Sequence, residues 1–182
     1  TKETIINFSQ AHAEPAWLQD RRLAAFEKMA ELELPTIERV KFHRWNLGDG
    51  IIADSEASAN VPDFTATGDN LKLVQVGTQT VFEQVPADLL AKGVVFTDFY
   101  SALEEIPEVI EKHFGSARPF DEDKLAAYHT AYFNSSAVLY VPDNVEIDQP
   151  IEGLFYQDSS SAVPLNKHIL IIAGRHSKFS YL

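Results

Sequence analysis

The stretch AVLYVPDNVEIDQPI, residues 137–151, decides the fold. Runs of β-branched and aromatic residues alternate there with very short corners, Pro142-Asp143-Asn144 and Asp148-Gln149-Pro150. The same alternation of short β-rich runs and corners continues, with further runs at 151–156, 168–173 and 179–182. Strands this short, joined by such tight corners, favour a β-solenoid in which each coil pairs with the next. A sandwich with tight hairpins is the alternative, but this stretch lacks the Asn-Gly and Asp-Gly pairs that are typical of hairpin turns.

The final run, residues 178–182, stops in mid-strand, and no capping segment follows it. A solenoid needs a cap because its last coil otherwise exposes unpaired backbone and apolar side chains. We therefore expect the chain to be a piece of a longer protein whose solenoid continues after Leu182. We also expect residues 168–182 to form an open edge through which this piece associates with a second copy of itself.

Upstream of residue 137 the hydrophobic period is helical. Residues 4–12, the run from Glu14-Pro15 to Leu34, and residues 107–114 and 121–133 are predicted helices. Proline suits the first helical position, and an acid there meets the positive end of the helix dipole. Asp98 is a predicted N-cap for a helix over 99–105.

Strands are also expected in this upstream part of the chain. Residues 71–76 and 80–85 read as a hairpin, and 94–97 as a short strand. Residues 36–70 read as a long loop, with an extended segment over 40–45. The fold class is therefore α+β, with an N-terminal α-helical or mixed domain over 1–136 and the start of a β-solenoid core over 137–182.

Composition excludes several classes of function. The net charge of −12 is concentrated in residues 51–136, which carry fourteen acidic and five basic side chains. That segment would repel nucleic acid, which proteins bind through Lys and Arg. The chain has no cysteine, which excludes disulfides, cysteine nucleophiles and thiolate ligation of a metal or cluster. No apolar run approaches the roughly 20 residues of a membrane span, and the N-terminus lacks a signal-peptide pattern, so we expect a cytoplasmic protein.

Side chains that could carry chemistry do not form a recognisable motif. The histidines show no metal-ligand spacing; they are His12, His43, His113, His129, His168 and His176. Ser159-Ser160-Ser161 lacks the frame of a nucleophile elbow, and Gly48-Asp49-Gly50 is too short for a phosphate-binding loop. The acids Glu104, Glu105, Glu108 and Glu111 read as one solvated helix face. We assign no catalytic, cofactor-binding or metal-binding residue, and expect no cofactor in this chain.

The cluster Glu14-Pro15-Ala16-Trp17 with Arg21-Arg22 has two interpretations. In the first, it is a capped helix start with a buried tryptophan. In the second, it is a helix that docks onto a partner protein. The sequence supports the two about equally.

Together these pieces resemble the SufB/SufD family of iron–sulfur cluster assembly proteins. Glu14-Pro15-Ala16-Trp17-Leu18 with Arg21-Arg22-Leu23 is similar to an N-terminal signature of the family, on its SufD side. Gly93-Val94-Val95-Phe96-Thr97-Asp98, together with the helix that ends at His113-Phe114-Gly115, is similar to its middle segment. Residues 138–151 resemble the point where its right-handed parallel β-helix begins, and they are the most specific part of the match.

The resemblance implies a non-enzymatic scaffold subunit of a Suf complex that supports cluster assembly and transfer. It implies two partners for the full-length protein, a SufB-like paralogue that pairs through the β-helix and a SufC-like ATPase that binds a later helical domain. It also implies that the cluster-related residues lie in the partner or after Leu182. Two other functions stay open on the residues alone: a β-helix carbohydrate-active enzyme, and a free-standing protein-binding module that uses loop 46–70.

Overall fold

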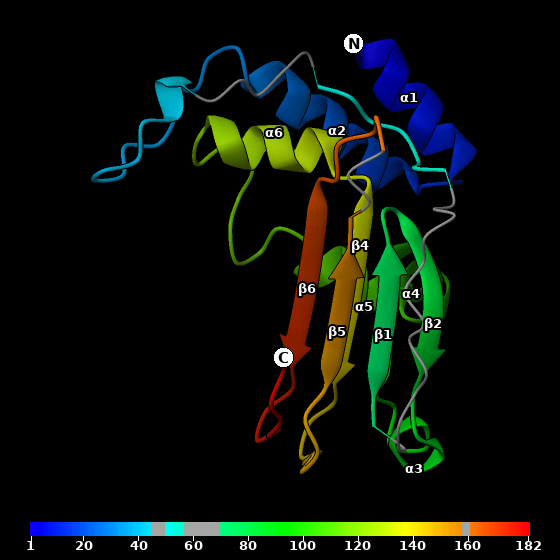
Figure 1. The fold of residues 1–182 in the computed structure, drawn as a ribbon. Helices are drawn as coiled ribbons and strands as arrows, with labels where there is room; N and C mark the ends of the chain where they lie inside the picture. The colour runs from blue at the N-terminus through cyan, green and yellow to red at the C-terminus, as the bar shows by residue number, and fades with distance from the viewer. Residues whose placement is uncertain (45–49, 57–69, 158–160) are drawn as a thin grey trace.

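The computed structural model describes residues 1–44, 50–56, 70–157 and 161–182, and its fold is α+β, as predicted (Figure 1). The helices are α1 (Lys2–Ala11), α2 (Ala16–Lys28), α3 (Ala87–Leu90), α4 (Phe99–Glu105), α5 (Pro107–His113) and α6 (Lys124–Tyr132), with a 3₁₀ turn η1 (Phe42–Arg44). The strands are β1 (Lys72–Val76), β2 (Gln79–Gln84), β3 (Val95–Asp98), β4 (Ser135–Val141), β5 (Glu152–Tyr156) and β6 (Lys167–Ala173).

The strands form two three-stranded mixed sheets, ordered β2-β1-β5 and β3-β4-β6. In the first sheet β1 is antiparallel to β2 and parallel to β5; in the second β4 is antiparallel to β3 and parallel to β6. The chain therefore passes from the second sheet at β4 to the first sheet at β5, and returns to the second sheet at β6. Each sheet joins strands from before and after residue 137, and the domain boundary placed there stays a prediction.

The parallel pairs after residue 134 repeat at a nearly constant distance along the chain. β4 pairs with β6 from Ser135↔Lys167 to Val141↔Ala173, and two single bridges continue the pairing at Glu146↔Lys178 and Ile151↔Tyr181. The corner between them is tight. A Cβ atom on Gly174 would lie 2.4 Å from the backbone nitrogen of Asp143, so only glycine fits where the two corners stack.

Strand β4 is covered on both faces, which explains its unbroken apolar run. Ala137, Leu139 and Val141 belong to a core shared with β1, β3 and the corner residues. Val138 faces the opposite way, into a cluster with Phe99 and Phe133 that α4 and α5 cover. A third cluster joins α1, α2 and α6, which gather beyond one end of the strands (Figure 1).

Local signals set most of the helix boundaries. Asp98 caps α4 through hydrogen bonds from the backbone N–H groups of Tyr100 and Ser101, and Asp123 caps α6 at Ala126. Pro107 lies in the first turn of α5, as expected for proline. The predicted hairpin forms around Gly77, whose φ of +57° lies in the left-handed region that favours glycine.

Three local predictions are wrong. Residues 40–44 are not extended, because the 3₁₀ turn η1 occupies Phe42–Arg44. Helix α2 ends at Lys28, several residues before the Leu34-Pro35 stop. Glu14 does not cap α2: its N-cap residue is Pro15, no side chain caps it, and the Glu14 carboxylate binds Arg22 instead. Most of the predicted loop lies outside the described residues.

Among the residues that the structure describes, no helix has both the length and the apolar character needed to cross a membrane.

Candidate functional site

A buried ion pair between Glu14 and Arg22 joins the N-terminal helices to the strands. Arg22 Nη2 lies 2.7 Å from Glu14 Oε1, and both side chains are fully buried. Arg22 also donates to the backbone carbonyl of Phe133, at 2.9 Å, and to that of Ala131, at 3.4 Å. These carbonyls lie where α6 ends and β4 is about to begin, so one guanidinium holds α2 against the helix-to-strand junction.

The Phe133 ring and the Tyr100 hydroxyl also contact this ion pair. The guanidinium carbon of Arg22 lies 3.7 Å from the ring centre of Phe133, a close cation–π contact. Tyr100 on α4 donates its hydroxyl to Glu14 Oε1 at 3.1 Å. Burial, with the nearby Glu14 charge, raises the pKa of Tyr100, so the hydroxyl keeps its proton and remains a donor. The carboxylate is thus satisfied without water.

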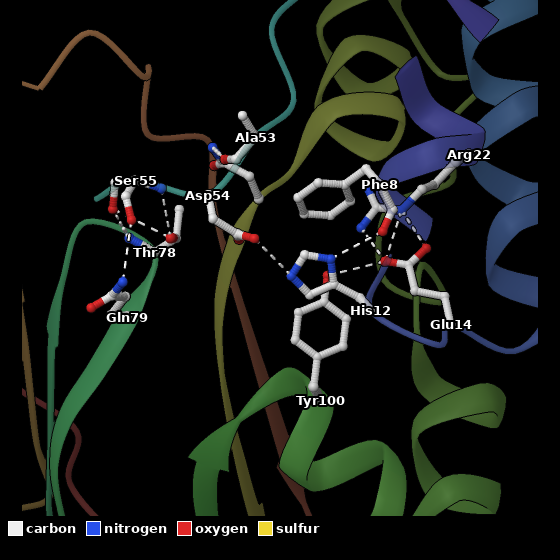
Figure 2. Close-up of polar contacts among 11 residues, drawn as sticks. Phe8, His12, Glu14, Arg22, Ala53, Asp54, Ser55, Thr78, Gln79 and Tyr100 are labelled. Atoms are coloured by element: carbon white, nitrogen blue, oxygen red, sulfur yellow. Dashed lines mark hydrogen bonds and ion pairs between the residues drawn. The ribbon is translucent and has the colours of Figure 1, made fainter. Parts of the chain in front are cut away.

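His12 extends the network toward the segment that precedes β1 (Figure 2). Its Nδ1 lies 3.0 Å from the Phe8 carbonyl, its Nε2 lies 3.2 Å from Asp54 Oδ2, and its ring stacks on Tyr100. Next to Asp54, Ser55 exchanges two hydrogen bonds with Thr78, at 3.0 and 2.9 Å. The turn of the β1–β2 hairpin is therefore fixed to Ser55 (Figure 2).

The contacts of this cluster bear on the two interpretations of the α2 start. Trp17 packs against Phe114, with ring centroids 5.9 Å apart, and Arg21 donates to the Phe114 carbonyl. Arg22 and Glu14 point inward (Figure 2). These contacts agree with a structural use of the cluster, but α2 has no side-chain cap, and the docking helix stays a prediction.

A second buried polar link lies between the two sheets. Lys167, at the start of β6, contacts Gln75 Oε1 on β1 and Ser135 Oγ on β4, the latter at 3.0 Å. Gln75 in turn donates to the Ser136 carbonyl at 3.0 Å. Burial lowers the pKa of Lys167 to about 7, partly offset by Asp98, so an appreciable fraction of the amine is neutral near pH 7. No local pattern in the sequence predicts this link.

The structure pairs two of the six histidines. His129 Nε2 on α6 lies 2.8 Å from His168 Nδ1 on β6, and His129 Nδ1 lies 2.9 Å from Asn166 Oδ1. Burial lowers the pKa of both rings, that of His168 to about 3, and both are therefore neutral at physiological pH. His12, His113 and His176 lie elsewhere, and His43 falls in η1.

The other sequence candidates form no site. Glu104 and Glu105 end α4, whereas Glu108 and Glu111 lie on the next helix, α5. The last turn of α5 also carries the basic residues Lys112 and His113. Gly48-Asp49 and Ser159-Ser160 lie outside the described residues, as do residues 46–49 and 57–69 of loop 46–70. Within the described ranges, no three His, Cys, Asp or Glu side chains are grouped so that they could hold a metal ion. The polar contacts described above hold the helices and strands in position against one another.

Residues 6–152 match a family model described as the SufBD protein N-terminal region. The chain belongs to the SufBD family. The SufBD assignment made from the residues is thus confirmed, and the matched range includes the Glu14–Arg22 pair, Tyr100 and all of β4.

Individual SufBD relatives extend the match to the whole chain. The iron–sulfur cluster assembly protein SufD of Bacillus subtilis is 33% identical over 193 aligned residues, which cover 100% of this chain and 44% of that protein. SufB of the same organism is 25% identical and covers 94% of this chain and 41% of its own length. A SufBD family protein of Arabidopsis thaliana is 24% identical over 100% of this chain and 44% of its own length. The chain thus spans less than half the length of these relatives.

Proposed function

We propose that this chain is the N-terminal part of a SufD-type scaffold subunit that supports iron–sulfur cluster assembly without catalytic residues of its own. The observation that carries the proposal is the SufBD match over residues 6–152, with 33% identity to a protein named SufD over the full chain. The site agrees with this role, because its charged side chains are used to hold elements together. We also propose a cytoplasmic location, which rests on the same SufBD match.

We further propose that residues 137–182 begin a right-handed parallel β-helix. The offset between paired residues supports it, since β4 pairs with β6 at a spacing of 32 residues and the bridges at 146 and 151 follow at 32 and 30. The order of the strands also supports it: β4 and β6 belong to one sheet and β5 to the other, as expected when one coil of a β-helix contributes a strand to each sheet. Parallel crossovers are right-handed in nearly all proteins.

The proposed partners are those of a Suf scaffold, namely a SufB-like paralogue and a SufC-like ATPase. If the ATPase binds a domain outside this chain, residues 1–182 alone should not retain it. A pull-down with SufC as prey tests this, with the full-length protein as the positive control. Equal retention of SufC by residues 1–182 and by the full-length protein would refute the placement of the docking domain.

The edge strand β6 supports the proposed association of this chain with a second copy. Ile169 and Ile171 on β6 are 42% and 43% exposed, and Leu182 is 70% exposed. Among the described strands, β6 is an edge strand of its sheet, and β4 is its neighbour. Burying each such side chain is worth about 1.5–3 kcal/mol, and we expect residues 1–182 to dimerise through this edge.

The molar mass measured by light scattering across a dilution series tests whether the chain dimerises through β6. Ile171→Lys is the variant, and Val81→Lys, on β2, is the matched control. Loss of the dimer in Ile171→Lys alone supports the proposal. A monomer at high concentration in the unmodified chain, or equal loss in both variants, would contradict it.

A further inference from the structure

A pocket of about 590 Å³ lies between the end of α5, α6 and the start of β6. Its walls are apolar and aromatic, and include Phe114, Phe120, Leu125 and Tyr128. The volume falls in the range of small-molecule sites, which are concave, mostly apolar and carry a few polar groups. Nothing in the proposed scaffold role uses this pocket.

The charge of the pocket is opposite to that of the chain. Arg21 and Arg118 line it, and none of its lining residues is acidic, although the chain has 27 acidic residues and a net charge of −12. Arg118 also pairs with Glu122, at 3.3 Å, and with Asp123, neither of which lines the pocket. Arg21 donates one hydrogen bond to the Phe114 carbonyl. A guanidinium has five N–H groups, so this bond uses one of the five. The pocket therefore suits an anion with an apolar body.

The inner part of the pocket carries unused hydrogen-bonding capacity. Asn166 Oδ1 can only accept, so His129 Nδ1 carries the proton in that contact, and neutral His129 presents a lone pair at Nε2. His168 Nδ1 must then donate to it, which leaves His168 Nε2 unprotonated. Among the described residues, His168 Nε2 and Asn166 Nδ2 are buried without a hydrogen-bond partner, and both residues line the pocket.

Buried polar atoms without partners are rare because each costs free energy, and they invite an explanation such as a ligand. Of these two atoms only Asn166 Nδ2, which is a donor, can pair with a carboxylate, because a carboxylate accepts hydrogen bonds and donates none. We propose that this pocket binds a small aromatic carboxylate, with the carboxylate between Arg21 and Arg118 and the ring against Phe114 and Phe120.

Benzoate is the probe, and benzamide, which has the same shape without the charge, is the matched ligand. Binding is followed by NMR shifts of the arginine and histidine side chains of this chain during titration. We expect benzoate to bind with a Kd of about 1 mM and benzamide about tenfold more weakly, since charge-assisted hydrogen bonds are the stronger ones. The shifts should centre on Arg118 and His168.

Arg118→Gln should weaken benzoate about fivefold and leave benzamide unchanged, because Arg118 supplies charge at the rim. His113→Gln, which lies outside the pocket, is the control and should change neither. Equal affinity for the two ligands, shifts centred away from the pocket, or no saturable binding of benzoate would each overturn the proposal. Because the readout is ligand binding, failure here leaves the scaffold proposal unaffected.

Discussion

Replacing Arg22 with methionine should remove a large part of the stability of this chain. Arg22→Met keeps an unbranched side chain of similar length but deletes the charge and every hydrogen bond that the guanidinium donates. The Glu14 carboxylate, whose side chain is 0% exposed, would then stay buried with the Tyr100 hydroxyl as its described donor. The carbonyls of Ala131 and Phe133 would lose their Arg22 contacts as well.

The magnitude follows from the burial of the pair. Removing one partner from a buried, hydrogen-bonded ion pair costs about 3–5 kcal/mol, because the other charge is left uncompensated. A domain of ordinary stability has roughly 5–15 kcal/mol in total, so the loss is a large fraction of it. The double variant Glu14→Gln with Arg22→Met should be less destabilised than the sum of the two single variants, since it removes both charges.

Urea unfolding measured by circular dichroism gives the free energies of unfolding for all four proteins in this cycle. Lys2→Met is the matched control, because Lys2 pairs with Glu27 on the surface, where the two side chains are 54% and 61% exposed. An exposed pair is worth less than about 1 kcal/mol. If Arg22→Met costs no more than Lys2→Met, or if the two single effects add without coupling, the ion pair does not have the role given to it here.

Three further predictions concern pH and the β4–β6 corner. The folded pKa of His168 is lowered to about 3, whereas the unfolded chain protonates near 6.5; stability is therefore full above pH 6.5 and falls toward pH 3, by about 2 kcal/mol from this group between pH 7 and 5. Urea midpoints across pH should fall less steeply in His168→Phe than in the unmodified chain, and parallel profiles would exclude this origin. Lys167, with a pKa lowered to about 7, should show an NMR midpoint near pH 7 for its ε-methylene group; a midpoint above about 9 would mean that the amine is solvated. Gly174→Ala places a Cβ atom 2.4 Å from the Asp143 nitrogen and should cost at least about 2 kcal/mol in urea unfolding, whereas Ala173→Ser, its exposed neighbour, should stay within about 0.5 kcal/mol; equal effects would mean that the corners do not stack closely.

Much of the secondary structure could be predicted because its signals are local. The cap at Asp98, Pro107 in the first turn of α5 and the hairpin around Gly77 each depend on neighbours within a few residues. The boundary of α2 could not be predicted as well, since its apolar pattern continues after Lys28 where the helix itself ends.

The pairings between distant segments could not be derived from periodicity. Glu14 looked like a helix-start acid, and only the fold brings Arg22 and the carbonyls of residues 131 and 133 to it. The spacing of His129 and His168 gives no motif, because α6 and β6 are far apart in sequence and meet through packing. The same holds for Lys167 and Gln75, which belong to different sheets.

Family resemblance supplied what local patterns could not. The Tyr140-Val141-Pro142 corner and the run through Ile151 pointed to a SufBD protein, and the family match over residues 6–152 bears that out. The parallel pairing of β4 with β6 agrees with the solenoid expected there, and the β-helix itself remains a proposal.

Anaerobic reconstitution tests most directly the central claim that this chain is a structural part of a scaffold with no metal centre of its own. Residues 1–182 are incubated with iron and sulfide, desalted, and examined by visible absorption and iron analysis, with a known cluster protein as the positive control. Because the chain has no cysteine and no group of three potential metal ligands among its described residues, we predict no charge-transfer band and no stoichiometric iron. A stable band with one or more irons per chain would contradict the account.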